Sequence, residues 1–394
     1  MRKTKILLCA VLAVSTAGIS TAWAQEQMPL WSSVDIQFYG FIKLDAAYDT
    51  ARSTPGNFVQ WVDSDHMRQN DDQFNMTANQ TRLGFNFTGP TVGAAQTTGK
   101  VEVDFYGSSL AENKAGILLR HAFLKIAYPE DDFSILAGQT SDVISPLFPS
   151  TISYTVCWWA GNPGYRRPQI RLTKGFDLDN DVRMEVIGAA TRNIGSVSPF
   201  GPGDSGEDSG LPTFQSRVGF TFPLIGDQPT ALGISGHWGE EEYDFDATDC
   251  YDKCNSWSLN VDLTQPVNDW LTFKGEFFTG QNLSQYLAGI GQGITVDAVN
   301  ETIDEIGSQG GWITANMTPI EDWTFTIGAS MDDVDAGDVG IGDRTLNNTI
   351  FANALYNINA KTQIGLEITK WHTERRQTGS ADNFRTQLAF IYKF

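Results

Sequence analysis

FRTQLAFIYKF, residues 384–394, alternates between two kinds of side chain and closes the chain on Phe394. The even positions are mostly aromatic or aliphatic, whereas the odd positions include Arg385, Gln387 and Lys393. Because successive side chains of a strand point to opposite faces, this stretch predicts a strand with one apolar and one charged face. A soluble sandwich would turn the apolar face inward, whereas a membrane barrel would turn it toward lipid.

The first residues of the chain have the three parts of a secretory signal peptide. Basic residues at the start are followed by an apolar run over residues 6–19 and by Ala22-Trp23-Ala24, which fits a cleavage site. The apolar run is too short for a transmembrane anchor, and Cys9 lies too early for a lipoprotein site. We therefore expect residues 1–24 to be a signal peptide.

The remainder of the chain has no stretch of about 18 uninterrupted apolar residues, so we expect no transmembrane helix. An exported chain without a helical span is periplasmic, secreted or an outer-membrane barrel. We expect residues 25–33 to form a short periplasmic segment and residues 34–394 to form one folded domain. The formal net charge of −20 excludes a general nucleic-acid binder, which would be basic, and fits a surface with acidic loops.

Alternating runs like the one at the end of the chain recur 16 times from residue 34 onward. Seven of the connections between them are short and rich in Pro, Asp, Asn and Gly, which favour turns. These alternate with longer polar connections, and Phe133, Trp270 and Trp323 begin strands beside turns, as an interfacial aromatic belt requires. The pattern predicts an all-β fold: a 16-stranded antiparallel transmembrane β-barrel with short periplasmic turns and long extracellular loops.

This architecture gives Phe394 two readings. It would end the closing strand at the periplasmic interface, where it is an ordinary residue of the aromatic belt, an assembly signal read by the barrel-insertion machinery, or both. The location that follows is the outer membrane of a Gram-negative bacterium, with lipid and lipopolysaccharide around the wall.

A barrel of 16 strands is wide enough for an aqueous channel, lined by the residues opposite the apolar set. A charge costs little there, but about 2–4 kcal/mol if it faces lipid near the midplane. Fixed cations concentrate anions in such a pore, and Arg suits carboxylates, so the sequence favours small anionic solutes. The candidate anion-binding residues are Arg166, Arg167, Arg171, Arg82, Lys43, Lys125, Arg183 and Arg217. Each charge taken alone is equally consistent with a merely solvated wall.

The third long loop, residues 141–167, is apolar for a segment that would face water, with Trp158 and Trp159 among its residues. We expect this loop to fold into the lumen, although packing against a neighbour in an oligomer would also bury it. Arg166 and Arg167 at its end would then lie beside Arg82 and Arg171 and form an arginine-lined constriction.

Two further features fall in acidic loops. Cys250 and Cys254 lie close together between two strands, and in an oxidising compartment we expect a small disulfide there, with a metal site as a weaker alternative. Residues 333–338, DVDAGD, have oxygen ligands at calcium-like spacing but lack a full EF-hand loop, so loop-bound Ca²⁺ is the only cofactor considered.

Several stretches resemble DcaP-like outer-membrane porins. They are FYGFIKLDAAYD (38–49), NQTRLGFNFTG (79–89), LRHAFLKI (119–126), LAGQTSDVISPLFP (136–149) and GNPGYRRPQIRLTKG (161–175). The resemblance is specific over residues 34–176 and general to 16-stranded porins beyond. It implies a trimeric, passive diffusion channel that prefers dicarboxylates and other organic anions. Some members carry a helical periplasmic segment, for which only residues 25–33 are available here.

Other functions are weaker. A barrel enzyme would need a Ser/His or Asp/His constellation, and the chain has four histidines, of which His121 and His237 are expected to face the lumen. An adhesin or receptor would act through its loops, which the sequence does not exclude as a second role. A general pore without anion preference is the closer alternative.

Overall fold

The structure is a computed structural model. It describes residues 34–64, 71–107, 115–178, 181–193, 209–225, 228–245, 248 and 250–394. The expected signal peptide and the segment 25–33 lie outside the described residues.

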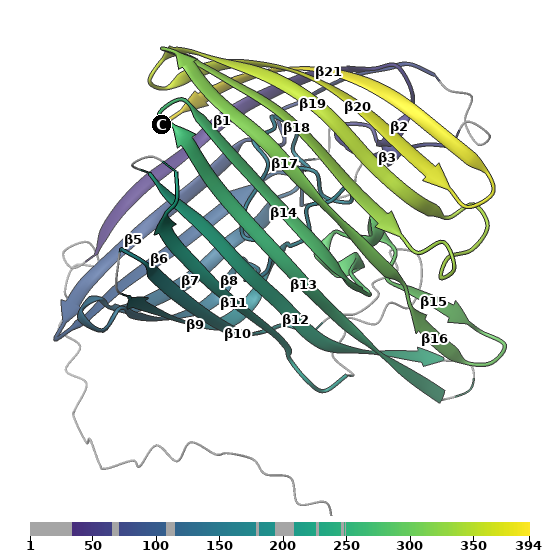
Figure 1. Cartoon of the computed structure of the whole chain (residues 1–394), viewed down its shortest axis with the longest axis horizontal. Coiled ribbons are helices and arrows are strands. Elements are labelled where there is room, and N and C mark those ends of the chain that lie inside the picture. The colour runs from purple at the N-terminus through teal and green to yellow at the C-terminus, as the bar shows by residue number, and fades with distance from the viewer. Residues whose placement is uncertain are drawn as a thin grey trace, which may run out of the picture.

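Within the described residues, 17 strands form one antiparallel sheet that closes on itself (Figure 1). These strands are β1 (Asp35–Asp49), β4 (Gln73–Thr77), β5 (Arg82–Val92), β6 (Ala95–Asp104), β7 (Leu118–Tyr128), β8 (Phe133–Ser141), β9 (Arg166–Asp177), β10 (Arg183–Thr191), β11 (Thr213–Pro223), β12 (Pro229–Phe245), β13 (Cys250–Asn268), β14 (Leu271–Gln281), β17 (Gly307–Ile320), β18 (Trp323–Val334), β19 (Arg344–Asn359), β20 (Thr362–Arg375) and β21 (Gly379–Lys393).

Closure follows from the pairing of the first and last strands. β1 pairs with β21 on one side, from Phe41 opposite Lys393 to Asp49 opposite Arg385. On its other side β1 pairs with β5 along its first half and with β4 along its second. Because β4 and β5 together make one row beside β1, the described sheet is the expected closed barrel of 16 strands, and both its fold class and its strand count are confirmed.

The wall has the orientation that a membrane barrel requires. On β1 the Ile42 side chain is 54% exposed to the outside, whereas its neighbour Lys43 is 3% exposed and points into the lumen. The same alternation holds along β20, where Leu366 and Ile368 face outward and Glu367 is buried. Apolar side chains on the lipid face and charges on the water side avoid the cost of a charge in lipid.

Three long connections carry segments that are buried against the inner wall of the barrel. The first carries the hairpin β2 (Ser53–Pro55) and β3 (Val59–Val62). The second joins β8 to β9 and is called here the inward loop, residues 142–165. The third joins β14 to β17 and contains η2 (Ser284–Tyr286), η3 (Gly289–Gly291), β15 (Ile294–Asp297) and β16 (Thr302–Glu305).

Small apolar clusters hold these connections together. Val59 and Val62 of β3 pack with Ala160 of the inward loop and with Trp371 of the wall. Ile144 packs with Phe278, Leu283 and Tyr286, which joins the inward loop to the third connection. A short 3₁₀ turn, η1 (Pro129–Asp131), connects β7 and β8 at the opposite end of the barrel. No helix among the described residues is long and apolar enough to span a membrane.

The prediction of a disulfide between Cys250 and Cys254 is wrong. Cys250 and Cys254 are free thiols that lie on the single strand β13, paired opposite Phe245 and Glu241 of β12. Four residues of extended strand span about 13 Å, whereas the Cα atoms of a disulfide lie at most about 7 Å apart. The acidic stretch expected as a loop is a continuation of the β12–β13 hairpin instead, which extends past the membrane wall beside β15 and β16 (Figure 1).

Candidate pore constriction

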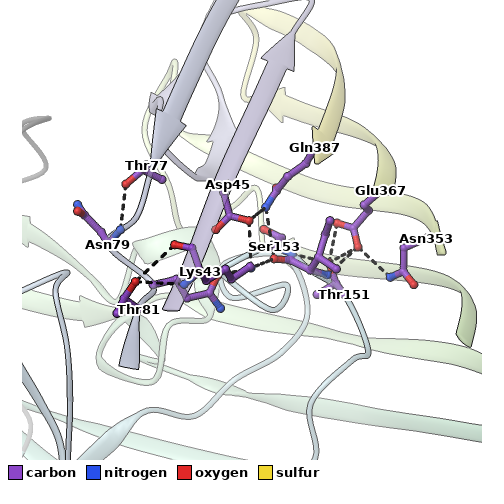
Figure 2. Close-up of polar contacts among 12 residues, drawn as sticks. Lys43, Asp45, Thr77, Asn79, Thr81, Thr151, Ser153, Asn353, Glu367 and Gln387 are labelled. Atoms are coloured by element: carbon purple, nitrogen blue, oxygen red, sulfur yellow. Dashed lines mark hydrogen bonds and ion pairs between the residues drawn. The ribbon is translucent and has the colours of Figure 1, made fainter. Parts of the chain in front are cut away.

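The inward loop crosses the lumen and is anchored to the far wall by one carboxylate. Glu367 of β20 is 2% exposed and accepts hydrogen bonds from Thr151 Oγ1 (2.7 Å) and Ile152 N (2.8 Å). Asn353 of β19 donates to the same carboxylate at 3.0 Å and to the Ser150 carbonyl at 2.8 Å. Figure 2 shows the contacts of Thr151 and Asn353 meeting at the Glu367 carboxylate. A buried carboxylate here is stable because loop donors satisfy it.

Lys43 holds the same loop from the neighbouring strands. Its Nζ donates to the Ile152 carbonyl at 2.7 Å and to Gln80 Oε1 at 2.6 Å, and lies 3.1 Å from Asp45 Oδ1. Gln387 of β21 donates to Asp45 at 2.8 Å (Figure 2). Lys43 is therefore buried, paired and engaged with the protein backbone. The sequence assigned it to the constriction, and the structure places it at the loop anchor.

Further around the barrel, the acids of the lumen are also engaged. Glu276 of β14 accepts from Leu147 N at 2.7 Å and from Trp312 Nε1 at 3.1 Å. Asp49 pairs with Arg385 at 2.7 Å. Because these carboxylates are used to hold the loops or to neutralise a wall arginine, they add little free negative charge to the pore.

A cluster of cations lies on β5, β6 and β7. Arg120 is buried and donates from Nε to Glu102 (2.8 Å) and from Nη1 to Asp104 (2.7 Å). Arg82 Nε lies 3.4 Å from the same Glu102, and Tyr39 Oη donates to Glu102 at 2.7 Å. Lys100 Nζ lies 3.8 Å from Glu102. The cations Arg82, Lys100 and Arg120 therefore surround the two acids Glu102 and Asp104. We call these five charged residues the wall cluster.

Arg166, at the end of the inward loop, adds a cation to this cluster. It lies within electrostatic range of Arg82, and its guanidinium carbon is 4.6 Å from the ring centre of Tyr165 and 5.5 Å from that of Trp158. Arg166 is 6% exposed. Within the described part of the chain no carboxylate lies at ion-pair distance from it, and its Nε and Nη2 have no hydrogen-bond partner. A buried guanidinium without a hydrogen-bonded acceptor is costly, and here the two aromatic rings beside it are the contacts that the structure gives it.

The other two arginines of the expected constriction are locked. Arg167 Nε lies 2.7 Å from Asp142 Oδ1, its Nη2 donates to the Gln285 carbonyl at 2.9 Å, and its guanidinium lies 4.0 Å from the ring centre of Tyr286. Arg171 donates to Gln169 Oε1 at 2.9 Å and to the Ser141 carbonyl. Adjacent residues of a strand diverge, so Arg166 and Arg167 reach different neighbours.

The remaining candidates lie apart from the constriction. Arg217 forms a two-pronged ion pair with Asp262, at 3.0 and 2.6 Å. Arg183 lies near the periplasmic turns, half-exposed, and pairs with Asp132 and Asp177. Lys125 is half-buried on β7 and has no ion pair among the described residues. The structure thus brings Arg82 and Arg166 together and distributes the rest along the pore.

Sequence reasoning missed Arg120, the most strongly paired member of the wall cluster. The ladder between β6 and β7 shifts register there: Glu102 lies opposite His121 and Val103 opposite Leu119, so Arg120 is an extra residue. Such a bulge redirects a side chain that strict alternation would place on the other face. The apolar residues of the inward loop gave a partly correct signal, because Trp158 is buried but Phe148 stays 45% exposed.

The described histidines contact hydroxyl or carboxylate groups of the wall, and one of them, His372, lies 3.0 Å from Asp382 and 3.2 Å from Glu374. His237 is buried, with its Nδ1 2.7 Å from Ser258 Oγ and its Nε2 2.8 Å from Ser256 Oγ, so both ring nitrogens are already engaged. No group of three or more His, Cys, Asp or Glu side chains in the described ranges could hold a metal ion, including the part around residues 333–338 considered for Ca²⁺. There Asp335 and Asp338 accept hydrogen bonds from loop amides.

Comparison with known proteins agrees with this architecture. The family model for the DcaP outer membrane protein matches residues 22–198. The solved outer membrane channel DcaP of Acinetobacter baumannii superposes with a TM-score of 0.75 at 19% identity, covering 92% of this chain and 98% of that one. No curated protein is a significant sequence match.

More distant porins share the fold. An anion-selective porin from Comamonas acidovorans superposes with a TM-score of 0.56 at 9% identity, covering 92% of this chain and all of that one. OmpF of Salmonella typhi superposes with the same TM-score at 11% identity, covering 91% and 97%. Residues 22–198 therefore match the DcaP outer membrane protein family, and the described barrel has the fold of a 16-stranded outer-membrane porin: a multi-pass β-barrel that acts as a passive channel and not as an enzyme.

Proposed function

We propose that this channel favours small organic anions, dicarboxylates among them, over neutral and cationic solutes of similar size. The observation that carries the proposal is Arg166, a buried guanidinium at the inward loop without an ionic partner in the described structure. A permeating carboxylate would supply the two acceptor oxygens that a guanidinium binds best. The sequence resemblance to DcaP-like porins points in the same direction.

The charge balance around Arg166 supports this preference. Counted with the wall cluster, four cations (Arg82, Lys100, Arg120 and Arg166) face the two carboxylates of Glu102 and Asp104. In a pore with walls of low dielectric constant, such an excess raises the local concentration of anions. The net charge of −20 belongs to the whole sequence, which includes acidic extracellular residues far from the constriction.

The proposed partners rest on other grounds: the trimer on the resemblance to DcaP-like porins, and the others on the barrel fold. We propose that the channel assembles as a homotrimer, that its outer wall contacts lipid and lipopolysaccharide, and that the barrel-insertion machinery assembles it. Chemical cross-linking of the detergent-solubilised protein followed by mass determination tests the trimer, and a monomer mass would contradict it.

The test of selectivity is the zero-current potential of the purified protein in a planar bilayer under a KCl gradient. We expect an anion-selective wild type and an Arg166→Gln variant with a permeability ratio lower by roughly fivefold, the equivalent of about 1 kcal/mol between charges near contact in water. Arg183→Gln is the matched control, because that arginine lies at the periplasmic rim with two acidic partners. Cation selectivity that neither variant alters would contradict the proposal.

A further inference from the structure

An aromatic pocket adjoins Arg166 where the inward connections meet the wall. Its volume is about 230 Å³. Six of its lining residues are aromatic and come from three parts of the chain: Phe58, Tyr106, Tyr154, Trp158, Trp159 and Tyr165. An apolar protein cavity of about 150 Å³ already accepts benzene, so this pocket has room for one ring and a small substituent.

The rings form a continuous surface. Tyr106 and Tyr154 stack with ring centres 3.8 Å apart, and the edge of Phe58 meets Tyr106 at 5.4 Å. Trp158 meets Tyr154 at 88° and Tyr165 at 69°, with ring centres 5.8 Å apart in each pair. The rings do not fill the space between them, and a partly open pocket remains beside them.

Polar groups at the pocket provide the other half of a binding site. The guanidinium of Arg166 lies over the rings of Trp158 and Tyr165, and it is the unpaired cation described above. The indole Nε1 of Trp158 and the amide Oδ1 of Asn57, both of which belong to lining residues, are also buried without a hydrogen-bond partner. An aromatic wall with one unsatisfied donor, the Trp158 indole, and a cation beside it fits a ring that carries a negative charge, whereas Asn57 Oδ1 is an acceptor and adds nothing to anion binding.

We propose that this pocket binds aromatic monocarboxylates, with the ring between the aromatic side chains and the carboxylate toward Arg166. The inference rests on the proposed anion preference and adds a ring specificity to it. Ring–ring contacts in offset or edge-to-face geometry favour an aromatic ring over a saturated one of the same size. We therefore expect the channel to retain benzoate longer than it retains cyclohexanecarboxylate.

The experiment measures current blockage of the purified full-length protein in a planar bilayer by sodium benzoate and by sodium cyclohexanecarboxylate. These anions have the same charge and nearly the same size. We expect benzoate to bind roughly two- to tenfold more tightly. Tyr154→Leu should remove this difference and leave the KCl permeability ratio unchanged, whereas Tyr356→Leu, a control on the outer wall, should change neither.

The outcomes separate the two proposals. Equal blockage by both anions in an anion-selective wild type would overturn the pocket inference and leave the anion preference standing. Blockage by neutral benzyl alcohol as strong as that by benzoate would also overturn it, because the carboxylate would then play no part. A wild type without anion selectivity would contradict the proposed function itself. The comparison of the two anions needs no variant, so a misfolded Tyr154→Leu protein would not prevent the test.

Discussion

At the scale of single residues, the negative charge of Glu102 should reduce the channel's preference for anions. This carboxylate lies between Arg82 and Arg120 and offsets part of their charge. Glu102→Gln keeps the shape and an acceptor oxygen for Tyr39 and Arg120, so we expect a folded channel whose zero-current potential shifts further toward anion selectivity. Glu130→Gln, in the exposed turn η1, should leave the potential unchanged. A shift toward cations in Glu102→Gln would contradict the wall cluster as the selecting element.

The cysteines give a second residue-scale prediction. In the native protein we expect a maleimide to label Cys250, which is exposed, and to spare Cys157 and Cys254, which are buried. Burial raises the pKa of the Cys157 thiol to about 12, so it stays protonated at neutral pH. Unfolding should expose all three thiols to the reagent. If only one thiol were labelled in the unfolded, unreduced chain, the predicted disulfide between Cys250 and Cys254 would be present after all.

The same thiol links stability to pH. Because the pKa of Cys157 is higher in the folded protein than in the unfolded chain, the folded state holds its proton longer. Its contribution to stability is complete at neutral pH and falls as pH rises through about 9 toward 12. The free energy of unfolding should therefore fall less between pH 8 and pH 10 in Cys157→Ser than in the wild type. Urea unfolding at the two pH values measures this difference.

At the scale of elements, the strands were predictable and the inward packing was only partly so. Alternation identifies a strand such as β21 because one face meets lipid and the other water. Burial of the first and third inward connections was not predictable, because Val59, Val62 and Tyr286 gain their burial from partners distant in sequence. The β12–β13 hairpin was predicted too short, since beyond the membrane both faces are solvated and alternation no longer marks a strand.

The inward loop makes an element-scale prediction through its anchor. Glu367→Ala removes the acceptor of Thr151, Ile152 and Asn353 and leaves these donors buried. Hydrogen bonds to a charged group contribute about 1.5–3 kcal/mol each, so we expect the loop segment around Thr151 to leave the wall, while the contact of Leu147 with Glu276 and the closed barrel remain. Single-channel recordings should then show a larger, noisier conductance and weaker selectivity. Glu374→Ala, on the same strand with its side chain half-exposed, is the control. An unchanged conductance would show that other contacts suffice.

At the scale of the whole molecule, closure joins the two ends of the barrel and gives Phe394 contacts with β1. Its ring stacks on Phe38 of β1 with centres 5.0 Å apart, and its backbone N donates to the Gly40 carbonyl at 3.2 Å. Gly40 is required at this point, because a Cβ there would lie 2.1 Å from the Arg82 carbonyl oxygen. These contacts suffice for a structural role, so the assembly role has to be tested separately.

Phe394→Ala separates the two roles when folding is compared in detergent and in cells. Loss of one aromatic pair costs about 0.5–1.5 kcal/mol beyond buried area, which a closed barrel should tolerate on refolding. Phe390→Ala removes an outward aromatic of the same strand and is the matched control. If both variants refold alike but only Phe394→Ala fails to reach the outer membrane, the insertion machinery reads the terminal residue. If the two variants reach the membrane equally, Phe394 acts only as part of the aromatic belt, because closure then depends on the ladder between β1 and β21.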